Sequence, residues 1–149
     1  MALAKVQSYS KFLIQVGNGA SPEVFAAPCG LTSRGFNRTA ETNDTNVPDC
    51  DDEDAPSWLA RDVVSLSGEI SGSGVLDTAA LDVWDDWFQS GLAKNCRVVL
   101  DVPLAQNGRH WAGSFYLTSF NITAERGAKV NVEVTLISDG AITTVAAAA

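Results

Sequence analysis

The sequence has little of the chemistry on which enzymes and metal sites depend. Its 149 residues include one histidine and three cysteines. His110 stands beside Trp111 with no Gly-x-Ser-x-Gly motif in the chain, which argues against a serine hydrolase. Cys29, Cys50 and Cys96 are far apart in sequence, which argues against zinc ligation and against a disulfide framework. We therefore predict no catalytic residue, no metal ligand and no cofactor.

Carboxylates are present, but their spacing fits neither a calcium loop nor a glycosidase. An EF-hand loop needs a glycine at its sixth position and a glutamate at its twelfth, and the acidic run of residues 49–54 offers neither. Asp85 and Asp86 are adjacent on an expected helix, so their carboxylates point apart instead of facing one substrate. These acids are interpreted as solvated surface charge.

Long apolar runs and an excess of basic charge are also missing. No stretch approaches the roughly 18 apolar residues of a membrane span, and the order of charges and apolar residues in a signal peptide is not found. We expect no membrane association and a reducing compartment. Ten basic and eighteen acidic residues give a net charge of −8. Without a basic patch to hold phosphates, specific binding of DNA or RNA is not expected.

The negative charge is concentrated in one segment. Seven of the eighteen acidic residues lie between Glu41 and Asp54, where there is no lysine or arginine. Pro48 and Pro56 flank the densest part of this run, and hydrophobic periodicity is absent. We predict a long acidic loop over residues 40–56.

Alternating apolar and polar residues predict β-strands in most of the remaining chain. The clearest alternation covers residues 11–16, 63–74, 95–102, 110–123 and 129–137, with weaker strands at 23–27 and 29–39. The alternation changes phase near Thr118 and Ser119, which predicts a β-bulge. Asn107-Gly108 predicts a tight hairpin turn, and Arg126-Gly127 predicts another turn.

One segment changes to helical periodicity. In residues 77–90 the apolar side chains Leu81, Trp84, Trp87 and Phe88 recur every three or four positions, which predicts an amphipathic helix that packs on a sheet. The sequence therefore predicts one domain over residues 1–149, mainly β, as an antiparallel β-sandwich or open barrel with one amphipathic α-helix. The small apolar residues 141–149 are interpreted as a C-terminal tail.

A small β-domain without catalytic residues suggests self-assembly through its sheet edges. The strand at 130–136 has a regular pattern and few charges that would block pairing, so we expect it to be exposed at an edge. Edge strands could then pair between copies, while the loop and the tail reach further neighbours.

The ordered set of these segments resembles a major tail tube protein of long-tailed (siphovirus-type) bacteriophages and gene transfer agents. The resemblance covers most of the chain, and the very acidic character of the loop departs from it. The resemblance rests on five segments: the opening strand KFLIQV at 11–16, the long loop at 40–56, SGSGVL at 71–76 before the helix, WAGSFYLTSF at 111–120 and VNVEVTLISDG at 130–140.

The resemblance implies a tail tube fold and a structural role in the virion. Six copies would form a ring, rings would stack into a hollow tube, and genome DNA would pass through its lumen without specific binding. It also implies a tape-measure protein inside the tube, a tail terminator and baseplate proteins as partners, and assembly in the cytoplasm of the host bacterium. A negative wall would keep phosphates from adhering.

Three sets of residues are candidates for roles in such a tube. The polar sides of two strands are candidates for the lumen, although an ordinary solvent-facing sheet surface would look the same: Ser65, Ser67, Glu69, Ser71, Ser73, Asn131, Glu133 and Thr135. The acidic loop is a candidate contact with the adjacent ring through Asp44, Asp49, Asp51, Asp52, Glu53 and Asp54. Its possible basic counterparts are Arg34, Arg38, Arg61 and Lys94, and the C-terminal residues 142–149 are expected to lie along an interface.

Two other functions remain open at this point. Another sandwich-fold tail component, such as a tail terminator or a baseplate hub protein, would form single rings. A carbohydrate-binding β-sandwich could use Trp58 or Trp111 as a stacking platform.

Overall fold

The computed structural model describes residues 2–19 and 23–147, which form a seven-stranded antiparallel sheet and one α-helix. The strand order is β2-β1-β5-β6-β7-β4-β3. The strands are β1 (Phe12–Gly17), β2 (Phe25–Ala26), β3 (Leu31–Val47), β4 (Trp58–Val75), β5 (Lys94–Leu100), β6 (Arg109–Thr123) and β7 (Asn131–Ala146). The helix is α1 (Leu81–Ser90), and short 3-10 turns cover Tyr9–Lys11 and Leu104–Gln106.

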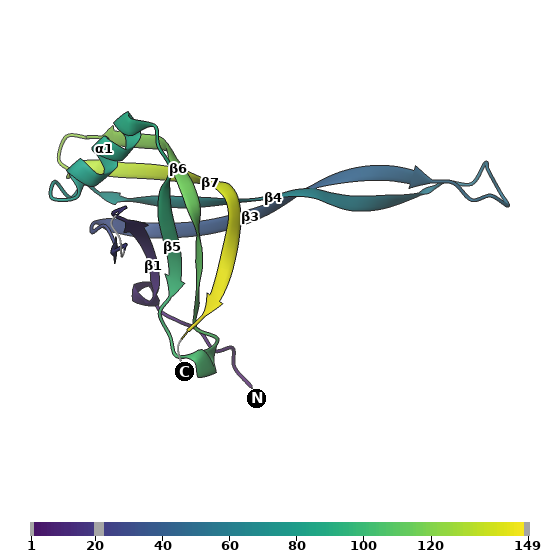
Figure 1. Cartoon of the computed structure of the whole chain (residues 1–149), viewed down its shortest axis with the longest axis horizontal. Coiled ribbons are helices and arrows are strands. Elements are labelled where there is room, and N and C mark those ends of the chain that lie inside the picture. Colours follow the sequence, from purple (N-terminus) through teal and green to yellow (C-terminus); the bar gives the residue numbers. More distant parts are fainter. Residues whose placement is uncertain (1, 20–22, 148–149) are drawn as a thin grey trace.

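The sheet folds over on itself into two crossing layers (Figure 1). β3, β4 and the first part of β7 form one layer, while β1, β5 and the other part of β7 run across it. β7 bends near Gly140, whose φ of 89° is left-handed, and its pairing with β6 shifts in register at the same place. The bend allows one continuous sheet to build both layers.

The two ends of the sheet are tied together. Arg34 in β3 donates a hydrogen bond of 2.6 Å from Nη1 to the carbonyl oxygen of Phe12 in β1, and the Tyr9 hydroxyl donates to the carbonyl oxygen of Leu31. The Arg34 guanidinium also lies 4.3 Å from the centre of the Tyr9 ring. The sheet is therefore a mainly β, antiparallel open barrel, which confirms the predicted fold class.

The core lies between the layers and beneath the helix. Trp84 and Trp87 are buried and stacked, with ring centroids 6.1 Å apart, and Trp87 Nε1 donates to the carbonyl oxygen of Leu92 at 2.8 Å. Helix α1 ends at Gly91, whose φ of 66° is the left-handed conformation expected at a helix C-terminus. The most completely buried core residues include Ile70, Cys96, Val98, Phe115, Val134 and Leu136.

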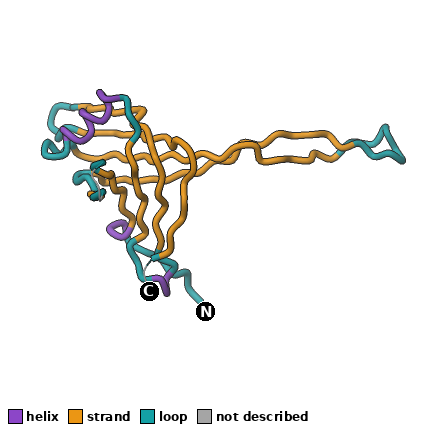
Figure 2. Tube along the Cα trace, viewed as in Figure 1, coloured by secondary structure: helices purple, strands orange, loops and turns teal. Residues whose placement is uncertain are grey.

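The loop predicted at residues 40–56 is correct for residues 48–56 and wrong for residues 40–47. β3 continues to Val47 and pairs with β4 from Trp58, so residues 40–47 are strand and only residues 48–57 form a loop. Figure 2 shows the paired strands leaving the body, with the loop at their end. Alternation in a sequence signals that one face is buried, and neither face of this projecting hairpin is buried, so no alternation marks it.

Other predicted boundaries also change. The helix begins at Leu81 instead of residue 77, because the Asp77 carboxylate accepts a hydrogen bond from the Ala79 amide in a turn before the helix. Most of the predicted tail at 141–149 is strand, since β7 continues to Ala146; positions 148–149 lie outside the described residues.

The turn predicted at Arg126-Gly127 is confirmed, and the other predictions on turns and edges give one further confirmation and two errors. The β-bulge predicted near Thr118 is confirmed by a register shift between Leu117 and Ser119. The turn at Asn107 is longer than the two-residue hairpin predicted there, because a 3-10 turn precedes it. β7 lies between β6 and β4, so it is not an edge strand; the edges are β2 and β3. Residues 20–22, between the strands predicted at 11–16 and 23–27, lie outside the described residues.

Candidate assembly surfaces

One side of the layer formed by β3, β4, β7 and β6 has a continuous patch of polar side chains, bordered by the exposed apolar residues Val75 and Ile137. Ser71 and Ser73 in β4 pair with Thr135 and Glu133 in β7, and this register places their side chains on one face. The face continues onto both neighbouring strands. We call it the polar face: Ser33, Gly35, Asn37, Thr39 and Glu41; Ser65, Ser67, Glu69, Ser71 and Ser73; Asn131, Glu133 and Thr135; Ser119, Asn121 and Thr123.

All eight lumen candidates therefore share this face, and Asn131 lies at its margin between Val75 of β4 and Thr123 of β6. Its charged residues are Glu41, Glu69 and Glu133, and no lysine or arginine is among its sixteen positions. Two basic residues of β3 occupy the opposite face, since Arg34 pairs with Gly72 and Arg38 pairs with Gly68 on the core side. The sheet thus separates anionic and cationic side chains.

Buried residues on the core side of the same strands fix which side chains point to the polar face. Ile70 pairs with Leu136, and Leu136 pairs with Leu117, and all three are buried. A slip of one residue would expose these side chains and bury Glu69 or Glu133, at a cost of several kcal/mol. The hydrophobic side of the sheet therefore sets the register that presents the polar side.

The second candidate surface is the projecting hairpin, which we call the arm (residues 40–66). Its strands pair without interruption from Thr42–Val63 to Val47–Trp58, and the chain turns through residues 48–57 (Figure 1). Asp44, Asp49, Asp51, Asp52, Glu53 and Asp54, the acidic candidates, all lie on the arm and are exposed. Among the described residues, no group of three acidic, cysteine or histidine side chains is arranged to hold a metal ion.

The predicted basic counterparts are already in contact with groups of their own chain. Arg61 Nε lies 3.2 Å from Asp44 Oδ1 across the arm, which is the one ion pair among the described residues. Lys94 Nζ lies 5.8 Å from the Trp87 ring centre, and Arg38 lies 5.5 Å from that of Trp111. Arg34 donates the hydrogen bond to Phe12 described above. Arg38 and Lys94 contact aromatic rings, and in the described parts of the chain neither forms an ion pair with a carboxylate.

Sequence reasoning missed several apolar residues that the arm exposes. The sequence predicts a half-buried strand from residue 63, yet Val63, Val64 and Leu66 are each more than half exposed because this part of β4 has left the body. Trp58 is 88% exposed at the far end of the arm, whereas Trp111 packs against Phe36 with ring centroids 5.5 Å apart. In the sequence, the only sign that Trp58 is exposed is its position shortly after the acidic segment.

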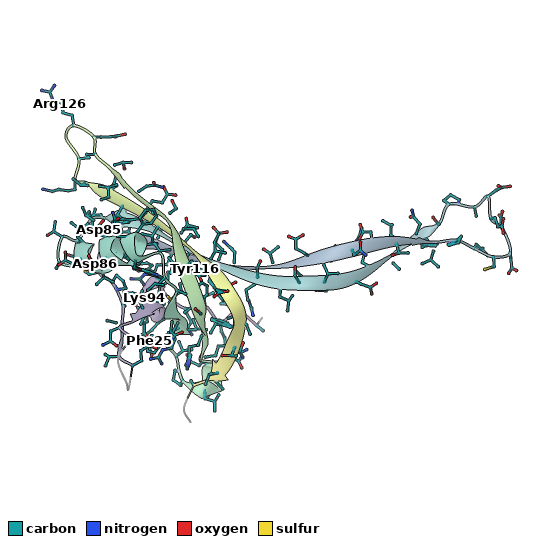
Figure 3. All side chains as sticks on the ribbon, turned by 45° about the horizontal axis from the view of Figure 1, so that its top comes forward. Phe25, Asp85, Asp86, Lys94, Tyr116 and Arg126 are labelled. Carbon is teal, nitrogen blue, oxygen red and sulfur yellow. The ribbon has the colours of Figure 1, made fainter. Side chains whose placement is uncertain are left out.

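Other exposed charges lie on the helix and in the turn between β6 and β7. Asp85 and Asp86 are exposed on helix α1, and Arg126 lies at the end of the turn between β6 and β7 (Figure 3). No helix among the described residues is long and apolar enough to cross a membrane.

A continuous polar face backed by a hydrophobic layer, together with a projecting hairpin, is the geometry of an assembly subunit. The sequence profile of the phage tail tube protein family matches residues 6–144. The chain belongs to the phage tail tube protein family. The family consists of structural virion proteins, so this tail tube protein is a structural component of a phage-type tail and not an enzyme.

Solved structures share the fold at low sequence identity. A chain from the virion of a native gene transfer agent particle has a TM-score of 0.73 at 21% identity, covering 94% of this chain and 99% of that one. A chain of the SPP1 tail tube has a TM-score of 0.67 at 10% identity, covering 94% and 79%. The tube-terminating cap of the anti-feeding prophage has a TM-score of 0.64 at 14% identity, covering 99% and 95%. No curated protein matches the chain in sequence.

Proposed function

We propose that this tail tube protein forms hexameric rings that stack into a hollow tube, and that DNA passes through the tube with the polar face as its wall. The polar face carries this proposal, because it presents three glutamates and no basic side chain on an extended sheet. Short serine, asparagine and threonine side chains hydrate such a wall, and like charge prevents phosphates from adhering to it.

The location in the virion tail follows from the family. We further propose how the tube is assembled and which proteins it contacts. The tube is built in the cytoplasm of the host bacterium around a tape-measure protein, closed by a tail terminator and joined to a baseplate. The fold it shares with a tube-terminating cap supports such contacts, since similar subunits stack on one another with matching surfaces.

Electron microscopy of the concentrated, purified protein tests this function. We expect hollow tubes of uniform width, with six-fold symmetry in end views. In a map of the tube, Glu69 and Glu133 should face the lumen. Monomers at every concentration would contradict tube formation, and single rings that never polymerise would indicate a terminator.

The arm is proposed to join successive rings. Its strands project from the body, and its acidic end is too far out to pack on its own sheet (Figure 2). Replacing residues 43–62 by Asn-Gly closes the hairpin at the Thr42–Val63 pair with a favourable turn. We expect the shortened protein to fold and to form rings without long tubes. Long tubes of the shortened protein would exclude this role.

A further inference from the structure

We propose that Trp58, at the far end of the arm, inserts into a groove at the base of the arm of another copy of this chain. The inference rests on the proposed function and specifies the residues that join one subunit to the next. Trp58 is 88% exposed, although tryptophan is a residue that protein interfaces use as an anchor. Val47, which pairs with Trp58 across the arm, is also more than half exposed, so the two side chains form an apolar patch of the kind that marks an interaction site.

The groove lies where the arm leaves the body. It has a volume of about 660 Å³, within the range of pockets that hold a drug-sized ligand and larger than one indole ring requires. Phe36 and Arg38 of β3, Leu66 of β4 and Ile142 of β7 line it. Leu66 is 77% exposed, so the groove presents an uncovered apolar surface beside a guanidinium group.

The charges of the two surfaces are opposite. Arg38 is the one charged residue that lines the groove, and its guanidinium carbon lies 5.6 Å from the centre of the Phe36 ring and 5.5 Å from that of the Trp111 ring. The end of the arm has five acidic side chains at residues 49–54 next to Trp58. An incoming arm would bring both a carboxylate for Arg38 and an aromatic face for cation–π contact.

The occupant must come from another copy. β3 and β4 pair from Ala40–Leu66 out to Val47–Trp58, with one register shift between Glu41 and Thr42, and this pairing holds Trp58 at the far end of the arm, away from its own base. Figure 1 shows the arm extended away from the body. A contact between the end of one arm and the base of the next uses two different surfaces, so it can repeat from copy to copy, and between successive rings such a contact extends a stack.

Truncation of Trp58 is the first test. Because Trp58 is exposed in the single chain, Trp58→Ala should leave the melting temperature of the monomer unchanged, while the concentration needed for tube assembly rises at least about tenfold. Arg38→Ala should act in the same direction, and Trp58→Phe should retain most of the assembly. Tubes of Trp58→Ala at the wild-type concentration would overturn the inference and leave the proposed function standing.

Fluorescence gives a readout that does not depend on tube yield. Trp84 and Trp87 are already buried, so burial of Trp58 should dominate the blue shift of tryptophan emission on assembly. Trp58→Phe tubes should lack that shift. An identical shift in both proteins would show that Trp58 stays exposed.

Cross-linking between copies tests the contact even if no tube forms. In a Cys29→Ser, Cys50→Ser background, one protein carries Leu59→Cys beside Trp58, and a second carries Ala40→Cys at the groove. A short bismaleimide should join the two proteins when they are mixed. The matched control replaces Ala40→Cys by Thr123→Cys, at the far end of the polar face, and should not be joined. Equal yields with both, or no product with either, would overturn the contact.

Discussion

Phe115 and Tyr116 are adjacent in β6, yet they occupy opposite faces of the sheet and should respond differently to truncation. Phe115 is 1% exposed in the core, and Tyr116 is 41% exposed beside the polar face. We expect Phe115→Ala to lower the free energy of unfolding by about 3–5 kcal/mol, because it removes buried area and leaves a cavity. Tyr116→Ala should change it by less than about 1 kcal/mol. Urea unfolding of both variants measures the difference, and equal losses would contradict the assigned faces.

The three cysteines should differ in reactivity for a related reason. Burial raises the pKa of the Cys96 thiol to about 12, partly offset by the nearby Lys94 charge. At pH 8 the folded protein should therefore react with Ellman's reagent at the exposed Cys29 and Cys50 only. All three thiols should react in denaturant. Rapid reaction of a third thiol in the folded protein would contradict the burial of Cys96.

The same thiol makes stability depend on alkaline pH. The unfolded chain loses the Cys96 proton near the ordinary cysteine pKa, whereas the folded chain retains it to about pH 12. The contribution of this thiol to stability is fully present below the unfolded pKa and is lost as the pH rises through this interval. Cys96→Ala should remove this part of the alkaline dependence, measured by urea unfolding between pH 8 and pH 11.

At the scale of elements, the sequence was informative where an element buries one face and uninformative where it buries none. The strand at 129–137 could be predicted because Val132, Val134 and Leu136 are buried while Asn131 and Glu133 are exposed. The helix could be predicted from its two tryptophans. Residues 40–47 and 141–146 are strands held by backbone pairing, with side chains that are mostly exposed, so hydrophobic periodicity could not identify them.

The arm should consequently be the least protected sheet segment of the free protein. It has two strands and exposed side chains throughout, and an isolated two-stranded hairpin is marginally stable in water. We expect fast hydrogen exchange of the amides of residues 42–47 and 58–63 in the monomer. The paired amides of β6 and β7 provide the control, because they lie inside the sheet and should exchange slowly in the monomer and in the polymer.

Assembly should then protect the arm if it lies between subunits. Exchange in the arm should slow by at least about tenfold in the polymer, while exchange in β6 and β7 changes little. An arm that exchanges equally fast in monomer and polymer would show that it remains in solvent and takes no part in the contact between rings.

At the scale of the whole molecule, net charge alone could not identify the face that we propose as the wall of the lumen. The chain carries a net charge of −8, but most of the acidic excess lies at residues 49–54, at the end of the arm and not beside Glu69 and Glu133. The polar face is anionic mainly because it lacks basic residues. Basic residues are missing from this face because the register of β3 and β4 places Arg34 and Arg38 on the opposite side of the sheet. The sequence alone did not show how far these two strands pair.

Reversing the charge of the polar face should convert a wall that repels DNA into one that retains it. The double variant Glu69→Lys and Glu133→Lys changes each subunit by four charges, on side chains that are already exposed, so the fold should persist. When this variant is polymerised with a short duplex, we expect the DNA to sediment with the tubes at low salt and to be released as salt rises. Wild-type tubes should retain none.

The location of the retained DNA decides whether the polar face lines the lumen. The matched control, Asp85→Lys with Asp86→Lys, makes the same change of charge on the exposed surface of helix α1. DNA held by the helix variant should be digested by nuclease, because a body surface outside the lumen is accessible. DNA held by the polar-face variant should be protected inside the tube. Equal digestion in both variants would place Glu69 and Glu133 on the outside and would exclude the polar face as the wall.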